Sequence, residues 1–265
     1  MAVTDVNTLL TWERAEIKRS STEASKAAAI RPTAAGLLKR YTFTEANTPY
    51  PLEYAFHLVG DAHGLRVLDL GSGTGSNSTL LAARGASVMS MDISPDLLTL
   101  AERRVELDGF GDSITTVCGS AHSIPLPSNS LDLVFGVAIL HHLDLALTAQ
   151  EVYRVLKPGG RAIFMEPTRN SRLLAFLRKL IPYQAADVSP FERPLREDEI
   201  ASFASLFTRT HARRFRLPFV PLLRLLLPKR FERRIFEWDR ALLQRWPRLG
   251  YFATVTVFEV HKRQK

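Results

Sequence analysis

At 265 residues the chain is long enough to bury a complete core as one domain with insertions. Its single cysteine, Cys118, excludes an internal disulfide, and no apolar run reaches the ~20 residues that a membrane-spanning helix needs. The formal charge of +8 is unevenly placed, because residues 209–248 carry 12 basic and 3 acidic residues. Residues 1–20 are charged rather than apolar, so a cytoplasmic location is expected.

Residues 1–50 are expected to form a helical lid segment that precedes the main domain. This stretch is rich in Ala, Ser, Thr and Lys, and Pro32 interrupts it. The apolar side chains with roughly helical spacing are Leu9, Leu10, Trp12 and Ile17. One or two mobile helices are therefore predicted here.

The main domain is expected to span residues 51–265 and to be organised around residues 65–93, LRVLDLGSGTGSNSTLLAARGASVMSMDI. A short apolar run leads into a Gly-rich turn, then into helical periodicity and a second β-rich run that stops at Asp92. Strand, Gly-rich turn, helix and strand form the nucleotide half of a doubly wound α/β fold. Glycines let the backbone approach a ligand closely, and Asp92 is placed to accept both hydroxyls of a ribose.

The spacing of the glycines indicates which nucleotide binds. A dinucleotide site needs G-x-G-x-x-G, whereas Gly71, Gly73 and Gly75 give G-x-G-x-G. Asp69, at the mouth of the loop, is expected to repel a phosphate and to attract an ammonium or sulfonium group, a contrast of a few kcal/mol at an effective dielectric constant of ~20. The turn is therefore predicted to bind S-adenosylmethionine rather than NAD or ATP.

The following segments continue the alternation of strands and helices. Ser94 is the expected N-cap of a helix, and Gly109 follows the end of that helix. Strands are expected over residues 113–119, 131–139 and 161–165, and a helix over residues 148–156. Residues 157–160, Lys-Pro-Gly-Gly, are expected to stop that helix before the fifth strand, which ends at Glu166.

Two insertions exceed a minimal fold of this kind. Residues 168–195 follow the fifth strand on the side where such sheets bind ligands, and are expected to form a substrate cover. Residues 218–250 are expected to form a basic helical insertion between the last two strands, near residues 208–217 and 251–260. For the basic region three interpretations remain open: a helical insert packed on the core or on a second copy, a contact with a lipid surface, and a contact with nucleic acid, which is the least favoured.

Four motifs in order, DLGSGTG, MDIS, CGSAHSIPLPSNSLDLVFGVAILHHL and RVLKPGGRAIFMEP, resemble the class I S-adenosylmethionine-dependent methyltransferases. The resemblance covers roughly residues 50–167 and is in particular to the small-molecule branch that resembles ubiquinone and menaquinone C-methyltransferases and antibiotic sugar O-methyltransferases. It implies a Rossmann-like, doubly wound, mostly parallel seven-stranded sheet with an antiparallel last strand, plus helical insertions.

The resemblance also implies where S-adenosylmethionine would bind. Relatives usually end the third strand with Gly-Asp-Ala, whose carboxylate receives the adenine amino group, whereas the triplet here is Gly119-Ser120-Ala121. The adenine is therefore expected to rest mainly on backbone groups and on Ile93. The expected cofactor-binding residues are Asp69, Gly71, Ser72, Gly73, Gly75, Asn77, Asp92, Ile93, Ser120, Ala121, Val137 and Tyr41. No metal site is expected.

Four aromatic residues near the N-terminal segment are candidates for a lid over the cofactor. In the enzymes that this chain resembles, an N-terminal segment often folds over the cofactor. The candidates are Tyr41, Phe43, Tyr50 and Tyr54. Ordinary packing of amphipathic aromatic side chains explains each of them equally well.

Two polar groups follow neighbouring strands, where a catalytic base would act. His141 and His142 follow the fourth strand, and Glu166 ends the fifth, so a carboxylate can meet an imidazole above the sheet and raise its basicity. Sugar O-methyltransferases that resemble this chain use His-His and an acid at matching places. His141 is therefore the expected base, with Glu166 as its partner and His142 nearer the cofactor or structural. The alternative is that the histidines buttress the loop and that Glu166 shapes the turn.

The leading functional hypothesis is methylation, at oxygen or carbon, of a small lipophilic or aromatic substrate in natural product, quinone or lipid metabolism. The protein would be cytoplasmic, with peripheral membrane contact through residues 209–248 as one alternative, and an oligomer is compatible with the sequence. Recruitment of RNA or protein by the same basic region, for methylation, is the second hypothesis. A third is a cofactor-binding protein that no longer methylates.

Overall fold

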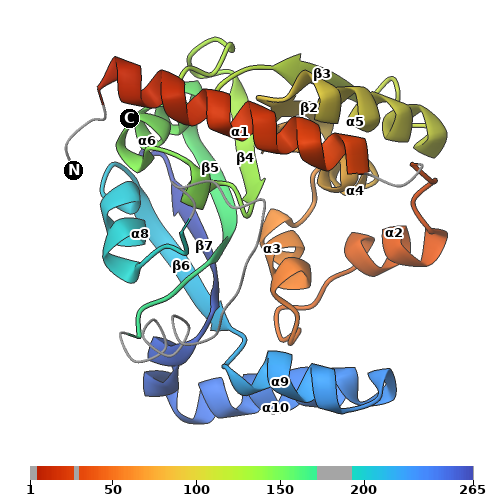
Figure 1. Cartoon of the computed structure of the whole chain (residues 1–265), viewed down its shortest axis with the longest axis vertical. Coiled ribbons are helices and arrows are strands. Elements are labelled where there is room, and N and C mark those ends of the chain that lie inside the picture. Colours follow the sequence, from red (N-terminus) through yellow and green to blue (C-terminus); the bar gives the residue numbers. More distant parts are fainter. Residues whose placement is uncertain (1–4, 27–29, 172–192, 265) are drawn as a thin grey trace.

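A seven-stranded sheet runs through the centre of the molecule in the order β3-β2-β1-β4-β5-β7-β6 (Figure 1). The structure is a computed structural model, and it describes residues 5–26, 30–171 and 193–264. The strands are β1 (Arg66–Leu70), β2 (Ser87–Asp92), β3 (Ile114–Cys118), β4 (Leu131–Val137), β5 (Leu156–Pro167), β6 (Thr208–Phe215) and β7 (Val255–His261). Strand β7 is antiparallel to β5 and β6, whereas β1 to β5 pair in parallel. The predicted doubly wound sheet with an antiparallel last strand is confirmed.

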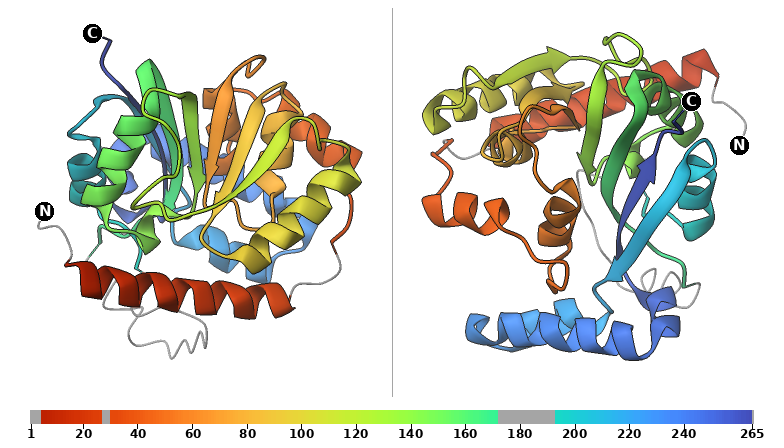
Figure 2. Two further views of the ribbon diagram at one scale, coloured as in Figure 1. Left: turned by 90° about the horizontal axis from the view of Figure 1, so that it is seen from above. Right: turned by 180° about the vertical axis from the view of Figure 1, so that it is seen from behind.

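Helices flank the sheet on both sides, as the two views of Figure 2 show. The helices are α1 (Val6–Lys26), α2 (Ala35–Thr42), α3 (Pro51–Val59), α4 (Ser76–Ala82), α5 (Pro95–Asp108), α6 (Leu145–Val155), α8 (Glu197–Ala204), α9 (Phe219–Leu226) and α10 (Glu232–Arg245). Three short 3-10 helices are η1 (Leu140–His142), η2 (Lys229–Phe231) and η3 (Pro247–Phe252). As expected, the Ser94 hydroxyl caps α5 by accepting a hydrogen bond from the Leu97 N–H at 3.3 Å.

Strand β4 shows why the core is continuous through the sheet. Leu133 and Phe135 belong to the buried cluster shared with α3 and α4, whereas Val134, between them, belongs to the cluster shared with α6 and α8. Successive side chains of a strand point to opposite faces, so a strand covered on both faces must be apolar throughout. This explains the apolar run that the sequence analysis assigned to a central strand.

Strand β5 is longer than the sequence predicted. Residues 157–160, expected to lie between helix and strand, form the first part of β5. Leu131 pairs with Leu156 and Leu133 with Arg161, so the ladder contains a register shift that accommodates the extra residues. Gly159 has a φ of +77°, which a β-branched or bulky residue rarely adopts, and this allows the strand to pass through the irregularity.

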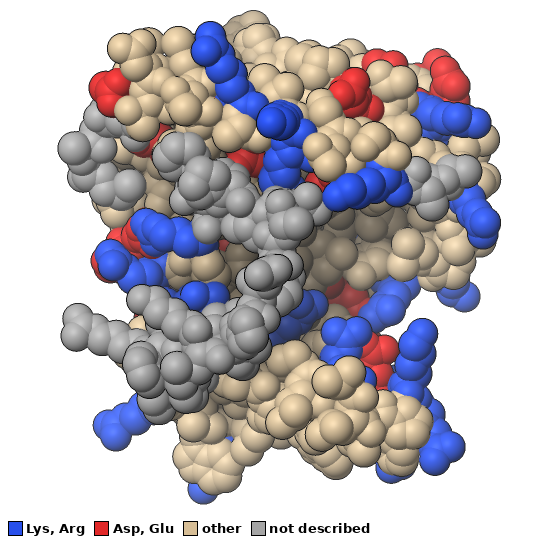
Figure 3. All heavy atoms as spheres, viewed as in Figure 1, with Lys and Arg blue, Asp and Glu red and all other residues tan. Residues whose placement is uncertain are grey.

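Between β6 and β7 lies a helical insertion made of α9, η2, α10 and η3, at the opposite end of the molecule from α1 (Figure 1). Lys and Arg side chains surround this part of the surface in Figure 3. The predicted substrate cover over residues 168–195 lies mostly outside the described residues. Its two ends are described, and Thr168 and Leu195 pair there in a parallel bridge. Within residues 5–26, 30–171 and 193–264, no helix has the length and apolarity that crossing a membrane demands.

Candidate functional site

A cavity of about 260 Å³ lies between α1 and the carboxyl ends of the parallel strands. Its volume is close to the lower end of the roughly 300–1,000 Å³ that small-molecule sites occupy. The predicted site residues that line it are Gly71, Gly73, Asp92, Ile93, Ser120, Ala121 and His142. The cavity therefore brings together groups from the ends of β1 to β4, where ligands bind in doubly wound sheets.

The Gly-rich turn is shaped by its contacts on one side and by open space on the other. A Cβ added to Gly71 would lie 2.5 Å from the Ile139 side chain, and one added to Gly75 would lie 3.0 Å from the Cβ of Ala101. A Cβ added to Gly73, where φ is +53°, would meet no protein atom within 4 Å. Gly71 and Gly75 thus allow close packing, whereas Gly73 leaves its backbone facing the cavity, which fits a nucleoside bound against the turn.

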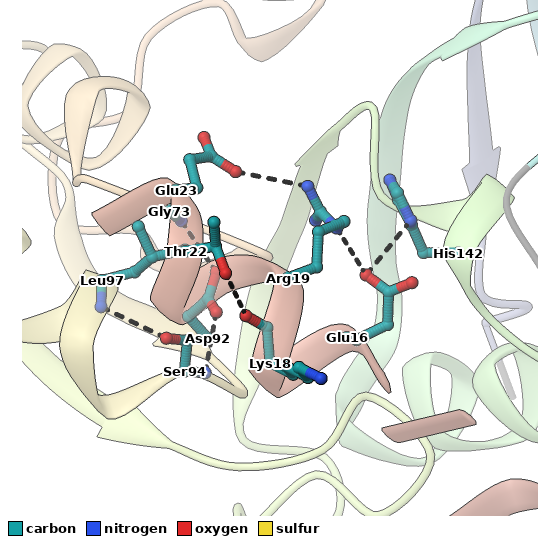
Figure 4. A network of polar contacts seen from close by, with 10 residues as sticks. All are labelled: Glu16, Lys18, Arg19, Thr22, Glu23, Gly73, Asp92, Ser94, Leu97 and His142. Carbon is teal, nitrogen blue, oxygen red and sulfur yellow. Dashed lines mark hydrogen bonds and ion pairs between the residues drawn. The ribbon is translucent and has the colours of Figure 1, made fainter. Parts of the chain in front are cut away.

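Asp92, at the end of β2, is a fixed carboxylate in the wall of the cavity (Figure 4). Its two oxygens accept hydrogen bonds from the Gly73 and Ser94 N–H groups, both at 2.9 Å. Burial raises the pKa of Asp92, and these backbone hydrogen bonds oppose that change. Each carboxylate oxygen keeps a further lone pair, so the group can accept hydrogen bonds from two neighbouring hydroxyls, as predicted for a ribose.

Asp69 corrects one part of the sequence analysis. Its side chain is fully buried beneath α4, and one oxygen accepts a hydrogen bond from the Ser78 hydroxyl at 2.6 Å. Burial raises the pKa of Asp69 to about 7. A carboxyl group that is half protonated near neutral pH and does not line the cavity cannot supply the predicted charge discrimination there.

An Asp69→Asn substitution is expected to change how stability depends on pH. Because the pKa of Asp69 rises from 3.8 to about 7 on folding, the native state binds more protons than the unfolded state between these values. Ionised Asp69 therefore lowers the free energy of unfolding as pH rises, by up to about 4 kcal/mol above pH 7. Urea denaturation should show that the free energy of unfolding of the Asn variant, minus that of the unchanged chain, increases from pH 4 to pH 7 and is constant above pH 7. A difference independent of pH would contradict the burial argument.

Most of the charged residues in the cavity wall belong to α1. The charged residues lining the cavity are Glu13, Glu16, Arg19, Glu23 and Asp92, four carboxylates and one guanidinium. Arg19 lies 3.0 Å from Glu16 and 3.2 Å from Glu23, and Glu16 lies 3.4 Å from the Nδ1 atom of His142 (Figure 4). This acidic excess disfavours a phosphorylated ligand and favours a cation.

Sequence reasoning missed these α1 residues because it followed the apolar positions of the segment. Glu13, Glu16, Ser20 and Glu23 are separated by three, four and three residues, which places them on one face of a helix. Glu16 and Ser20 are the buried residues of α1. The helical spacing of these polar side chains was the signal that α1 turns a polar face, rather than an apolar one, toward the domain.

Glu13 reaches across the cavity to the turn after β3. Its Oε1 atom accepts a hydrogen bond from the Ser120 hydroxyl and lies 3.0 Å from the Nδ1 atom of His122. The Nε2 atom of His122 accepts a hydrogen bond from the Asp144 N–H at 3.0 Å, so Nδ1 of the neutral ring carries the proton and donates it to Glu13. A carboxylate is thereby held beside Ser120, where the sequence offered only a hydroxyl.

The predicted meeting of His141 and Glu166 is present in the structure. Glu166 is fully buried, and its Oε2 atom lies 2.9 Å from Nδ1 of His141. Its Oε1 atom accepts hydrogen bonds from the Ile139 and Leu140 N–H groups, both at 2.9 Å. Glu166 therefore both orients an imidazole and holds the loop after β4, which combines the two alternatives left open by the sequence.

The two histidines have different positions. Their ring centroids are 4.1 Å apart, and His142, not His141, lines the cavity. Because Nδ1–H of His141 donates a hydrogen bond to Glu166, the Nε2 atom of that ring carries the lone pair. The pair can take up a proton, but its catalytic role stays a prediction.

The remaining predicted residues lie outside the cavity wall. Tyr41, predicted to bind the cofactor, instead packs its ring in the core, with a centroid 5.2 Å from that of Phe56. Core packing accounts for the presence of this aromatic side chain. Tyr50 likewise packs on Phe236, with centroids 4.9 Å apart, and Phe43 is 81% exposed. Four further residues that do not line the cavity are Ser72, Gly75, Asn77 and Val137. Within the described part of the chain, no group of three or more His, Cys, Asp or Glu side chains could hold a metal ion.

Comparison with known proteins matches residues 68–164 to a methyltransferase domain. The chain is 38% identical over 118 residues to a demethylmenaquinone methyltransferase of Symbiobacterium thermophilum, covering 43% of this chain and 47% of that protein. It is 35% identical over 150 residues to the ubiquinone/menaquinone biosynthesis C-methyltransferase of Methylococcus capsulatus, covering 54% of this chain and 58% of that protein. The chain thus spans about half the length of the curated relatives that it matches.

Similarity to solved structures extends over more of the chain. Geranyl diphosphate C-methyltransferase of Streptomyces coelicolor, solved with Mg²⁺, geranyl diphosphate and S-adenosyl-L-homocysteine, superposes with a TM-score of 0.59. The superposition covers 79% of this chain and 76% of that one at 15% identity. At this identity the likeness concerns the fold.

Proposed function

We propose that the protein is a class I S-adenosylmethionine-dependent methyltransferase that transfers a methyl group to a small, lipophilic or aromatic acceptor, since residues 68–164 match a methyltransferase domain and the relatives that match are methyltransferases. The observation that carries the proposal is the acidic cavity, in which Asp92 is fixed beside the Gly-rich turn. When bound, the cofactor supplies an electrophilic methyl group on a positively charged sulfur. Four carboxylates in the wall favour that charge, and the turn at Gly73 leaves room for the nucleoside.

The residues after β4 and β5 supply a proton acceptor. A phenolic ring loses its hydroxyl proton before the methyl group goes to the oxygen or, through the phenolate, to a neighbouring carbon. On the carbon route the methylated carbon then loses its own hydrogen as a proton and the oxygen regains one, so either route releases one proton in total. We assign the uptake of that proton to His142, in the cavity wall, and to His141, which lies beside it and is held by Glu166. Helix α1 covers the cavity and excludes water from the reacting groups.

A reduced quinone is the acceptor that we would test first, since matched relatives are named as demethylmenaquinone and ubiquinone/menaquinone methyltransferases. Purified full chain should bind S-adenosylhomocysteine in calorimetry. With S-adenosylmethionine and reduced demethylmenaquinone it should release that product together with an acceptor heavier by one CH₂. Binding of ATP or NAD in place of the sulfur nucleosides would contradict the proposal. The helical part of the basic region, α9 and α10, lies at the opposite end of the molecule from α1, so its position does not favour the RNA or protein alternative (Figure 1).

Glu13 is proposed to recognise the adenine amino group. The ends of β1, β2 and β3 are neighbours, so a nucleoside bound from the Gly-rich turn past Asp92 would bring its adenine to Ser120, where the Glu13 carboxylate is held. The experiment compares S-adenosylhomocysteine with S-inosylhomocysteine, which carries an oxygen in place of the amino group. The unchanged chain should prefer the adenine compound, and Glu13→Ala should reduce that preference roughly 10- to 150-fold, as expected for a hydrogen bond to a charged group.

Glu23→Ala provides the matched control, because Glu23 lies on the same face of α1 and lines the same cavity. This variant should keep the adenine preference. An unaltered preference in Glu13→Ala would remove Glu13 from the recognition of adenine. Failure of the unchanged chain to bind either nucleoside would instead contradict the proposed function as a whole.

A further inference from the structure

Helix α9 presents leucines on two faces, of which the structure uses only one. Val220 is buried with Ile235 and Phe236 of α10, and Leu223 packs against this cluster. On the outer face, Leu222, Leu225 and Leu226 are 55%, 82% and 65% exposed. A helix that only had to cover α10 would carry polar residues on its outer face. The outer leucines therefore require an explanation beyond the packing of the insertion.

Basic side chains follow these leucines directly. Lys229, Arg230, Arg233 and Arg234 are all exposed. The acidic residues of the insertion are already engaged: Glu232 pairs with Arg224 and Glu237 with Arg233, both at 2.8 Å, and buried Asp239 accepts the Arg216 and Leu217 N–H groups. The surface thus combines exposed leucines with an excess of positive charge, and Figure 3 shows Lys and Arg side chains around this part of the molecule.

We propose that the α9 surface, made of Leu222, Leu225, Leu226, Leu227, Lys229 and Arg230, docks on an anionic phospholipid membrane. With eight residues, α9 is far shorter than the ~20 residues that span a bilayer, and it would lie in the plane of the interface. The leucines enter the boundary between headgroups and acyl chains, and the cations bind lipid phosphates. This contact is independent of methyl transfer.

Charge complementarity favours this occupant over two others. In a two-fold symmetric dimer the same patch would face itself and bring the cations of both copies together. Nucleic acid offers phosphates for the arginines, but it offers no apolar phase for the exposed leucines of α9. An anionic bilayer matches both the exposed leucines and the positive charge.

The experiment is sedimentation of the full chain with vesicles of phosphatidylcholine, with and without about a third phosphatidylglycerol, at ~0.1 M salt. The unchanged chain should bind the anionic vesicles and not the neutral ones. The double variant Leu225→Glu, Leu226→Glu should bind at least about tenfold more weakly, because it loses apolar insertion and gains repulsion. Both leucines are exposed, so thermal melting should show an intact fold.

A matched control separates the position of the change from its charge. Leu107→Glu with Leu206→Glu alters two leucines that are 46% and 43% exposed on other elements, at the same net charge. This control should retain vesicle binding. The proposal is overturned if the unchanged chain ignores anionic vesicles, or if the two double variants bind them equally. It is also overturned if the α9 variant only abolishes a concentration-dependent dimer or an RNA complex.

Discussion

A Glu166→Gln variant is expected to lose turnover on the order of 10³- to 10⁴-fold while it keeps its fold and its affinity for S-adenosylhomocysteine. The amide oxygen can still accept the Ile139 and Leu140 N–H groups, but its NH₂ group would face Nδ1 of His141. The ring must then carry its proton on Nε2, the atom that has to accept one. A corresponding carboxylate-to-amide change in a serine protease triad lowers kcat about 10⁴-fold for this reason.

The measurement is kcat at saturating acceptor, with nucleoside affinity and thermal melting in parallel. His141→Ala should lower turnover similarly, and His142→Ala tests whether the ring in the cavity wall is also needed. Glu166→Ala serves as the structural control, because it leaves the two buried N–H groups and His141 without their acceptor and should cost about 3 kcal/mol or more of stability. Full turnover in Glu166→Gln would leave Glu166 as a support for the loop alone.

Asp92→Ala is expected to weaken S-adenosylhomocysteine binding by about 2–3 kcal/mol, or roughly 30- to 150-fold. The variant loses two charge-assisted hydrogen bonds to the ribose, and it also frees the Gly73 N–H that now fixes the turn. Asp92→Asn keeps the size of the side chain and one acceptor, so its loss should be smaller. Calorimetric affinity unchanged in Asp92→Ala would show that the ribose does not bind at the end of β2.

The fold could be predicted because local signals and burial agree. Apolar runs mark β1 and β4, glycines with positive φ mark the turn between β1 and α4, and Ser94 caps α5 as expected. Asp92 was found for the same reason, since the last residue of a parallel strand lies at the ligand edge. Even the pairing of His141 with Glu166 follows from the adjacency of β4 and β5.

The rest of the site depends on directions and long-range contacts that spacing does not encode. Asp69 and Leu70 are neighbours on β1, yet Leu70 lines the cavity and Asp69 points beneath α4, because side chains alternate along a strand. Glu13 meets Ser120 across 107 positions of the sequence. Such a contact can be expected only once the path of α1 across the strand ends is known.

The polar face of α1 has a consequence for the exchange of the spent nucleoside. Helix α1 is held over the cavity by hydrogen bonds and ion pairs of Glu13 and Glu16, and its buried residues are polar. The sheet beneath it is held together by apolar packing. Local opening of α1 would therefore leave the strands intact. Opening of this helix would then be the step at which the spent nucleoside leaves and a new donor molecule enters.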